Sequence, residues 1–89
     1  MPSVSAPIAN KLGLHARAAA KLTHVASGFQ SDIWLSRSGR RVNAKSIMGV
    51  MMLAAGQGTT VLIEAEGADA QQALAAIAKL IADNFGEGE

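Results

Sequence analysis

Four short runs of residues alternate between apolar and polar side chains, which is the pattern of half-buried strands. The runs cover residues 4–8, 33–35, 42–44 and 61–66. Pro7 falls in the first run, and because proline lacks a backbone N–H donor, we expect this strand at an edge of the sheet. Ser38 and Gly39 lie between the second and third runs, where they predict a tight hairpin turn.

Helical spacing of apolar residues predicts three helices, of which the first covers residues 16–27 and stops at Gly28. Its buried stripe comprises Ala18, Leu22, Val25 and Phe29. A short apolar helix follows in SIMGVMMLAA, with Ser46 placed as its N-cap. We expect Gly56 or Gly58 to end it.

The last helix opens at Asp69, and Gln72 three residues later completes a capping-box pattern. Its buried stripe comprises Leu74, Ile77, Leu80, Ile81 and Phe85. The order strand, helix, strand, strand, helix, strand, helix is the split βαβ arrangement with one helix added. We therefore expect an α/β (α+β) open two-layer sandwich, in which a four-stranded antiparallel sheet carries three helices on one face. The pattern leaves the strand order open.

The composition limits the chemistry of the chain. Its 89 residues suit one domain, with an ordered core from about residue 3 to 85 and a flexible GEGE tail. Cysteine is absent and the two histidines lie in no cluster with metal-ligand spacing, so we expect no disulfide, metal or cofactor. We see no apolar run long enough to span a membrane and no export signal, and so expect no membrane insertion and a cytoplasmic location.

The net charge is only +1, but the charges are unevenly distributed along the chain. Seven of the eight Lys and Arg residues lie between Lys11 and Lys45, whereas six of the seven acids lie from Glu64 onward. The basic segment is either ordinary solvated surface or a face that steers an acidic partner or a phosphate.

His15 stands immediately before the first helix and follows Gly13, which allows a tight turn. This position places the imidazole beside the N–H groups of Ala16, Arg17 and Ala18, which have no acceptor within the helix. A helix N-terminus attracts anions, and its dipole favours the neutral imidazole, whose ring nitrogen is a nucleophile. We therefore expect His15 to accept a phosphoryl group, steadied by these amides and by the Arg17 guanidinium. The absence of a nearby carboxylate base, phosphate loop or metal cluster disfavours an independent kinase or hydrolase.

Three segments of the chain resemble HPr, the histidine-containing phosphocarrier family of the bacterial phosphoenolpyruvate-dependent sugar phosphotransferase system. They are NKLGLHARAAAKL, VNAKSIMGVMMLAAGQGT and AEGADAQQAL, and the resemblance runs from about Val4 to Phe85. It implies the strand order 1-4-2-3 and a monomeric carrier without independent turnover. It also implies that His15 takes a phosphoryl group on Nδ1, the pros nitrogen, from enzyme I and passes it to enzyme IIA domains. The chain departs from the family at Ala18, where most members have proline, and at Leu12, where some have asparagine.

Ser46 has two interpretations. As an N-cap it contributes about 1 kcal/mol to stability and needs no other function. The resemblance to the HPr family implies a second role, because in some bacteria an HPr kinase/phosphorylase modifies this serine. A phosphate would be favourable at the helix N-terminus, but its charge would repel an acidic partner surface.

The short apolar helix cannot bury all of its faces on a sandwich, so we expect exposed side chains among Ile47, Met48, Met51 and Met52. Flexible methionines suit contacts with several partners. Arg17, Lys45 and Lys21 are expected around them as basic groups. Because the resembling family docks partners on such a surface, Ile47, Met48, Met51 and Lys45 are predicted partner-binding residues.

Other functions are weighed against this one. A nitrogen-branch phosphocarrier fits the same motifs, and a regulatory binding protein would make His15 incidental. RNA-binding modules of this size need interleaved aromatic residues or a GxxG-type loop, and the chain has only Phe29, Trp34 and Phe85, so we expect no nucleic acid partner. His24 lies inside the first predicted helix and is interpreted as a surface or structural residue, and Trp34 is placed on the outer face of the sheet.

Overall fold

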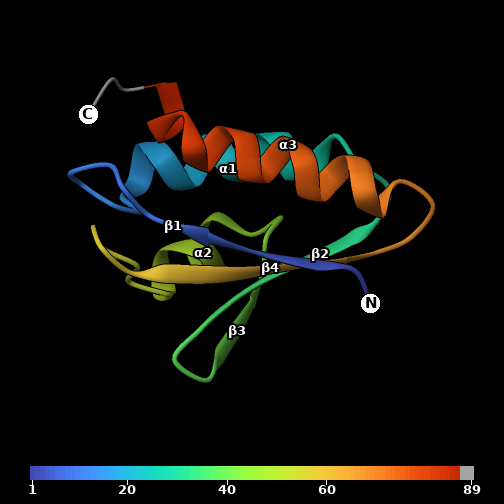
Figure 1. The fold of residues 1–89 in the computed structure, drawn as a ribbon, viewed down its shortest axis with the longest axis horizontal. Coiled ribbons are helices and arrows are strands. Elements are labelled where there is room, and N and C mark those ends of the chain that lie inside the picture. Colours follow the sequence, from blue (N-terminus) through green and yellow to red (C-terminus); the bar gives the residue numbers. More distant parts are fainter. Residues whose placement is uncertain (87–89) are drawn as a thin grey trace.

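A computed structural model of the chain describes residues 1–86 and contains one four-stranded antiparallel sheet with helices packed on it (Figure 1). The elements are β1 (Ser3–Pro7), α1 (Ala16–Ser27), β2 (Asp32–Arg37), β3 (Arg40–Asn43), α2 (Ile47–Met52), β4 (Thr60–Glu66) and α3 (Ala70–Ala82). A short 3₁₀ turn, Asn84–Gly86, follows α3. The predicted element order is confirmed, including both ends of α1. Residues 87–89 of the predicted tail lie outside the described residues.

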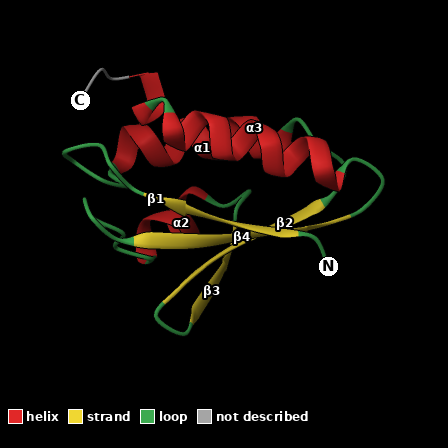
Figure 2. Ribbon diagram, in the orientation of Figure 1, coloured by secondary structure: helices red, strands yellow, loops and turns green. Residues whose placement is uncertain are grey.

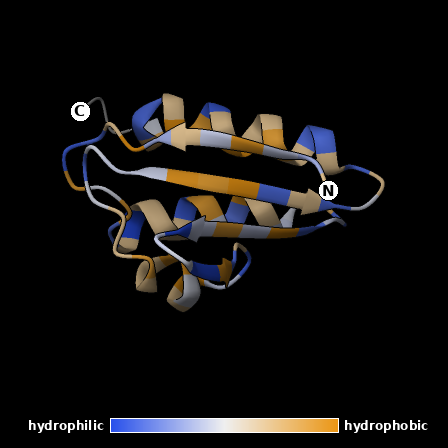
Figure 3. Ribbon diagram, turned by 60° about the horizontal axis from the view of Figure 1, so that its bottom comes forward, coloured by the Kyte–Doolittle hydropathy of each residue, from blue (hydrophilic) through white to orange (hydrophobic). Residues whose placement is uncertain are grey.

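The strands are ordered β1-β4-β2-β3, as the family resemblance implied. β4 is central because it pairs with both β1 and β2, and β1 is an edge strand as Pro7 predicted. The register places Ser3, Glu64, Trp34 and Asn43 in one row across the sheet. This row lies on the outer face, which Figure 3 shows in front of the helices.

The helices supply the second layer and enclose the core. α1 and α3 lie side by side over the sheet, and α2 packs against α1 and β3 (Figure 2). The core is formed by inward residues of every strand but β3 and by the helix stripes, with Leu22, Leu35, Ile63 and Ile77 fully buried. Each such side chain contributes roughly 1.5–3 kcal/mol when it leaves water, which is the main stabilising term in a chain without cysteine. Phe85 is also buried, but it lies on the turn after α3 rather than on the helix.

The β2–β3 hairpin has the predicted two-residue turn. Ser38 and Gly39 have φ values of +52° and +80°. Positive φ at both central positions is the conformation that matches the right-handed twist of the flanking strands. Gly28 also directly follows α1 as expected, although its φ of −76° is right-handed.

Helix α2 ends before the glycines that were predicted to stop it. The expectation of a stop at Gly56 or Gly58 is wrong, because the helix ends at Met52. The chain then turns at Ala54, which has a φ of +52° although it is not glycine.

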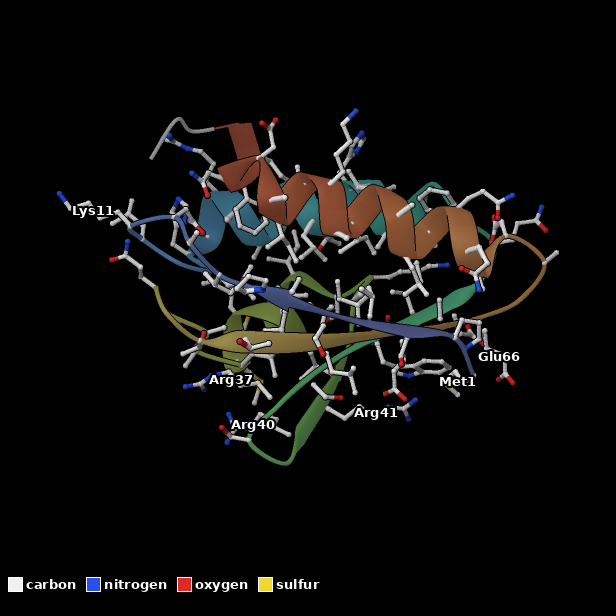
Figure 4. All side chains as sticks on the ribbon, viewed as in Figure 1. Met1, Lys11, Arg37, Arg40, Arg41 and Glu66 are labelled. Atoms are coloured by element: carbon white, nitrogen blue, oxygen red, sulfur yellow. The ribbon has the colours of Figure 1, made fainter. Side chains whose placement is uncertain are left out.

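Two arginines from the hairpin explain this early end. Arg40 Nη1 donates to the carbonyl of Met52 at 2.6 Å, and Arg37 Nη1 donates to that of Leu53 at 3.0 Å. Figure 4 shows both arginines near the β2–β3 turn. Cationic donors at the last carbonyls satisfy groups that a helix leaves unpaired and oppose its dipole favourably.

The capping box predicted for α3 is wrong. Asp69 occupies the N-cap position, but its carboxylate makes no bond to the helix amides. It instead accepts hydrogen bonds at 2.9 Å from the backbone N–H groups of Gln30 and Ser31, and another from the Ser31 hydroxyl. The Ser31 hydroxyl first, and then the Gln30 N–H, hold the pKa of Asp69 below its ordinary value of 3.8. Asp69 therefore ties the β4–α3 loop to the α1–β2 turn.

We predict that Asp69→Asn lowers the thermal unfolding midpoint at neutral pH. Because the pKa is lowered in the folded state, the carboxylate stabilises the fold above the ordinary value of 3.8, and this contribution is lost as the pH falls through the lower folded value. The difference between variant and wild type should therefore shrink in acid. Circular dichroism melts from neutral to strongly acidic pH measure it, with the exposed Asp32→Asn as the control. Equal midpoints for Asp69→Asn and wild type at neutral pH would contradict the prediction.

Candidate functional site

His15 occupies the N-cap position of α1, with an extended backbone and a half-buried side chain. The first hydrogen bond of the helix runs from the Ala19 N–H to the His15 carbonyl at 2.8 Å. The N–H groups of Ala16, Arg17 and Ala18 come before it and have no acceptor within the helix. The predicted placement of His15 at a helix N-terminus is therefore confirmed. Arg17 is exposed on the first turn.

The His15 ring is oriented by the chain just before it. Its Nδ1 lies 3.1 Å from the carbonyl oxygen of Gly13. A carbonyl oxygen only accepts, so this contact is a hydrogen bond when Nδ1 carries the proton, and Nε2 is then the unprotonated nitrogen of the neutral ring.

Gly13 is required at its position for two separate reasons. Its φ of +63° is left-handed, a conformation that other residues rarely adopt. A Cβ atom added to it would lie 2.5 Å from the Ala55 carbonyl oxygen and 2.7 Å from the Gly56 Cα. Next to it, the Leu14 N–H donates to that same Ala55 oxygen at 2.9 Å. The loop that carries His15 is thus pressed against the segment that follows α2.

Asn10 supports this loop and was not singled out in the sequence. Its side chain is fully buried, and its Nδ2 donates to the Gly13 carbonyl at 2.9 Å. Its own backbone carbonyl accepts from the Gly13 N–H at 3.1 Å. An asparagine three residues before a glycine is a turn signal, but the sequence pattern does not show that its side chain is buried.

Ser46 is the N-cap of α2, as predicted. Its Oγ accepts a hydrogen bond from the Gly49 N–H at 3.1 Å, and its side chain is half-buried. Because α1 and α2 pack against each other, the helix that Ser46 begins is a direct neighbour of the helix that His15 begins.

Helix α2 presents four apolar side chains to solvent, which we call the α2 patch. They are Ile47, Met48, Met51 and Met52, with exposed fractions of 45%, 70%, 40% and 57%. Of this helix only Val50 is fully buried, so the expectation that a short helix leaves apolar side chains exposed is confirmed.

Two lysines expected around the α2 patch are held within the fold. Lys45 Nζ donates to the Phe29 carbonyl at 2.8 Å, and Lys21 Nζ donates to the Phe85 carbonyl at 2.7 Å. Both side chains are half-buried. Their ammonium groups therefore bind backbone carbonyls at the ends of α1 and α3, and a partner contact by Lys45 stays a prediction.

Residues 1–86 show few features of metal sites, membrane-spanning helices or aromatic stacking surfaces. These residues contain no group of three or more His, Cys, Asp or Glu side chains that could hold a metal ion. None of their helices combines the length and apolar character that crossing a membrane requires. Trp34 lies on the outer face as predicted, but the Arg41 guanidinium covers it at 4.2 Å from the ring centroid. Arg41 is in turn paired with Glu64 at 3.3 Å, so the indole is stacked on an arginine of its own sheet.

Known proteins share both the sequence and the fold. Residues 3–83 match the family model described as the PTS HPr component phosphorylation site. The phosphocarrier protein HPr of Cupriavidus necator is 63% identical over 82 residues, which cover 92% of each chain. The crystal structure of HPr-C-His from Thermoanaerobacter tengcongensis superposes with a TM-score of 0.94 at 48% identity, covering 98% of each chain. An HPr dimer structure from the same organism superposes with a TM-score of 0.79 at 48% identity, covering 98% of this chain and 100% of that one.

The open sandwich with a histidine at the N-cap of its first helix is the arrangement expected of a phosphocarrier domain. Because residues 3–83 match the family model and the Cupriavidus necator protein is 63% identical over 92% of the chain, the chain belongs to the HPr family, the phosphocarriers of the phosphotransferase system. The dimeric relative shows that the family fold also occurs in a dimer, and the monomer expected for this chain stays a prediction.

We predict that Gly13→Ala destabilises the protein more than Gly39→Ala. Both glycines have positive φ, but no atom lies within 4 Å of a Cβ added to Gly39. Gly39→Ala should therefore cost only the left-handed conformation, roughly 1–2 kcal/mol. Gly13→Ala should cost about 1–3 kcal/mol more, because the methyl group must displace the Ala55–Gly56 backbone. Urea unfolding measures both free energies, and equal losses would show that the close approach at Gly13 is not a constraint.

Proposed function

We propose that this chain carries a phosphoryl group on His15, which it accepts from phosphorylated enzyme I and passes to enzyme IIA domains, without turnover of its own. The observation that supports this most directly is the position of His15 at the N-cap of α1. His15 comes directly before the N–H groups of Ala16, Arg17 and Ala18, which begin the helix and form a terminus that attracts anions. Membership of the HPr family supports the same role.

The transfer is a substitution at phosphorus. The lone pair of His15 Nδ1 forms the new N–P bond while the donor's bond to phosphorus breaks and its electron pair returns to the donor atom. Before the step the hydrogen bond between Nδ1 and the Gly13 carbonyl opens, Nδ1 gives its proton to solvent and Nε2 takes one up, so that the neutral ring carries its proton on Nε2. Bond making and bond breaking then balance without a metal or a further reactant.

The phosphoryl group is held only moderately, which suits a carrier. An anion at a helix N-terminus gains about 0.3–1 kcal/mol, and up to roughly 2 kcal/mol when partly buried. The exposed Arg17 guanidinium adds charge-assisted hydrogen bonds to the phosphoryl oxygens. Stabilisation on this scale steadies the phosphohistidine and still leaves it able to transfer onward.

Partner enzymes dock, in this proposal, on the α2 patch. Exposed methionines adapt to surfaces of different shape, and Met48 is the most exposed of the four. Ile47 and Met51 lie on the same short helix, which packs against α1 and so adjoins the helix that His15 begins. One patch therefore serves a donor and several acceptors in turn. Lys45 is included as a contact through the stem of its side chain.

Ser46 is the proposed site of regulation by an HPr kinase/phosphorylase. Its hydroxyl already accepts a hydrogen bond from the Gly49 N–H, so a phosphate there would keep an acceptor at the helix N-terminus. The added dianion would stand at the start of the α2 patch. Repulsion of an acidic partner surface would then slow transfer without unfolding the helix.

We predict that His15→Ala takes up no phosphoryl group, because no other side chain has the same place at the N-terminus of α1. Purified chain is incubated with phosphoenolpyruvate and enzyme I, and uptake is followed by intact mass and by lability in acid. The control is His24→Ala, which removes an exposed histidine inside α1 and should keep full uptake. An acid-labile phosphate on His15→Ala would contradict the proposal, and no uptake by wild type with several enzymes I would favour the regulatory binding protein.

We predict that Ser46→Asp slows phosphoryl transfer from enzyme I by about tenfold, which corresponds to roughly 1.4 kcal/mol of partner repulsion in the transition state. Initial rates at limiting enzyme I measure the effect. Ser5→Asp adds the same charge on the outer face of β1, away from α2, and serves as the control. If Ser46→Asp accepts phosphate as fast as wild type, the regulatory role is lost and only the N-cap remains.

A further inference from the structure

We propose that Asn10 is a positioning residue for the reaction at His15 and acts through the Gly13 carbonyl. The inference rests on the proposed function, because it concerns the nitrogen that takes the phosphoryl group. The Asn10 Nδ2 donates to the Gly13 carbonyl oxygen at 2.9 Å, and His15 Nδ1 lies 3.1 Å from the same oxygen. One carbonyl thus links a fully buried amide to the reactive imidazole.

The carbonyl is fixed because its peptide group is held at both ends. The Gly13 C=O and the Leu14 N–H belong to one planar peptide and point in opposite directions. The Leu14 N–H donates to the Ala55 carbonyl at 2.9 Å, while Asn10 Nδ2 holds the oxygen. The peptide cannot rotate to turn its oxygen away from His15 unless it breaks one of these bonds.

The orientation of the Asn10 amide is set by the same carbonyl. Turning the amide over would bring its Oδ1 against the Gly13 oxygen, and two acceptors repel each other. In the observed orientation Oδ1 is buried and has no hydrogen-bond partner among residues 1–86. A buried acceptor without a partner costs free energy, and an apolar side chain would avoid that cost. The contribution specific to the amide is therefore its Nδ2 donor, which holds the Gly13 carbonyl.

The hydrogen bond from Asn10 to the Gly13 carbonyl determines which nitrogen of the resting His15 carries the proton. The tautomer of a histidine follows from the hydrogen bonds of its two nitrogens, and a fixed carbonyl facing Nδ1 favours the Nδ1–H form. Phosphoryl transfer to Nδ1 needs the opposite form, with the proton on Nε2. Asn10 therefore keeps the His15 ring in a defined resting orientation. The ring leaves this orientation when Nδ1 turns to the phosphoryl donor.

The test is the ¹⁵N NMR spectrum of the His15 side chain, in the full unphosphorylated chain without a partner and at a pH where the imidazole is neutral. We expect the Nδ1–H form to predominate in wild type. Asn10→Ala should shift the ratio of the two forms about fivefold toward Nε2–H, the effect of losing one ordinary hydrogen bond. Asn10→Leu keeps close to the size of the side chain, has no N–H or O–H donor and should give the same shift.

The matched control is Gln57→Ala. Gln57 Nε2 donates to the Ala9 carbonyl at 3.1 Å. This variant therefore loses a hydrogen bond from a side-chain amide to the same loop, and the Gly13 oxygen is not affected. Its tautomer ratio should equal that of wild type, and a shift as large as that of the Asn10 variants would overturn the inference. Backbone amide spectra verify that each variant is folded. If Asn10→Ala does not fold, Asn10→Leu decides the test.

Two further outcomes would overturn the inference: a wild type in which Nε2–H predominates, and Asn10 variants that keep the wild-type ratio. No phosphoryl donor is present in this experiment, so its result does not depend on phosphate uptake. Failure of uptake by wild type would contradict the proposed function, whereas an unchanged tautomer ratio would contradict only the role of Asn10.

Discussion

The close approach of Gly13 to the Ala55–Gly56 backbone is the constraint on which the reactive end of this protein depends. A side chain at this position would meet a carbonyl oxygen at 2.5 Å, so only glycine allows the loop before α1 to lie against the segment after α2. That contact fixes the point at which the chain enters α1. It thereby places His15 at the N-cap, directly before the first amides of the helix.

The site that results is small and open, and this agrees with the chemistry of a carrier. His15 is half-buried at the start of α1, next in sequence to amides without an acceptor in the helix and to Arg17, which is exposed on the first turn. Such groups stabilise a phosphoryl group once it has formed, but they do not complete a transition state alone. In the proposed function the remaining donors come from the partner, so docking and chemistry are coupled.

The sequence predicted the elements and the place of His15 at a helix start because both are encoded locally. The helical spacing of apolar residues placed α1 at residues 16–27. The alternation of apolar and polar residues showed which side of β4 is buried. The strand order came only from the resemblance to the HPr family, since alternation shows which face is buried and not which strands are neighbours. The position of His15 at a helix start followed from Gly13, which allows a turn, and from the helical spacing of apolar residues after it.

The errors share one physical cause, which is a partner distant in sequence. Asp69 was expected to cap its own helix, but it binds Ser31, 38 positions away. The early end of α2 depends on two arginines of the preceding hairpin, which donate to the carbonyls of Met52 and Leu53. A pattern within one segment cannot show such bonds, because each one exists only after the segments have packed. Asn10 was missed for a different reason, because its partner Gly13 is only three residues away but the pattern does not show that its side chain is buried.

The central claim is that the N-terminus of α1 holds the phosphoryl group of His15, and backbone amide NMR of the wild-type chain before and after phosphorylation tests it most directly. The account predicts that the amide signals of Ala16, Arg17 and Ala18 shift most, because their N–H groups gain a dianionic acceptor. If the phosphorylated chain instead shows its largest changes away from these three amides, the helix N-terminus does not hold the phosphate and the account is contradicted.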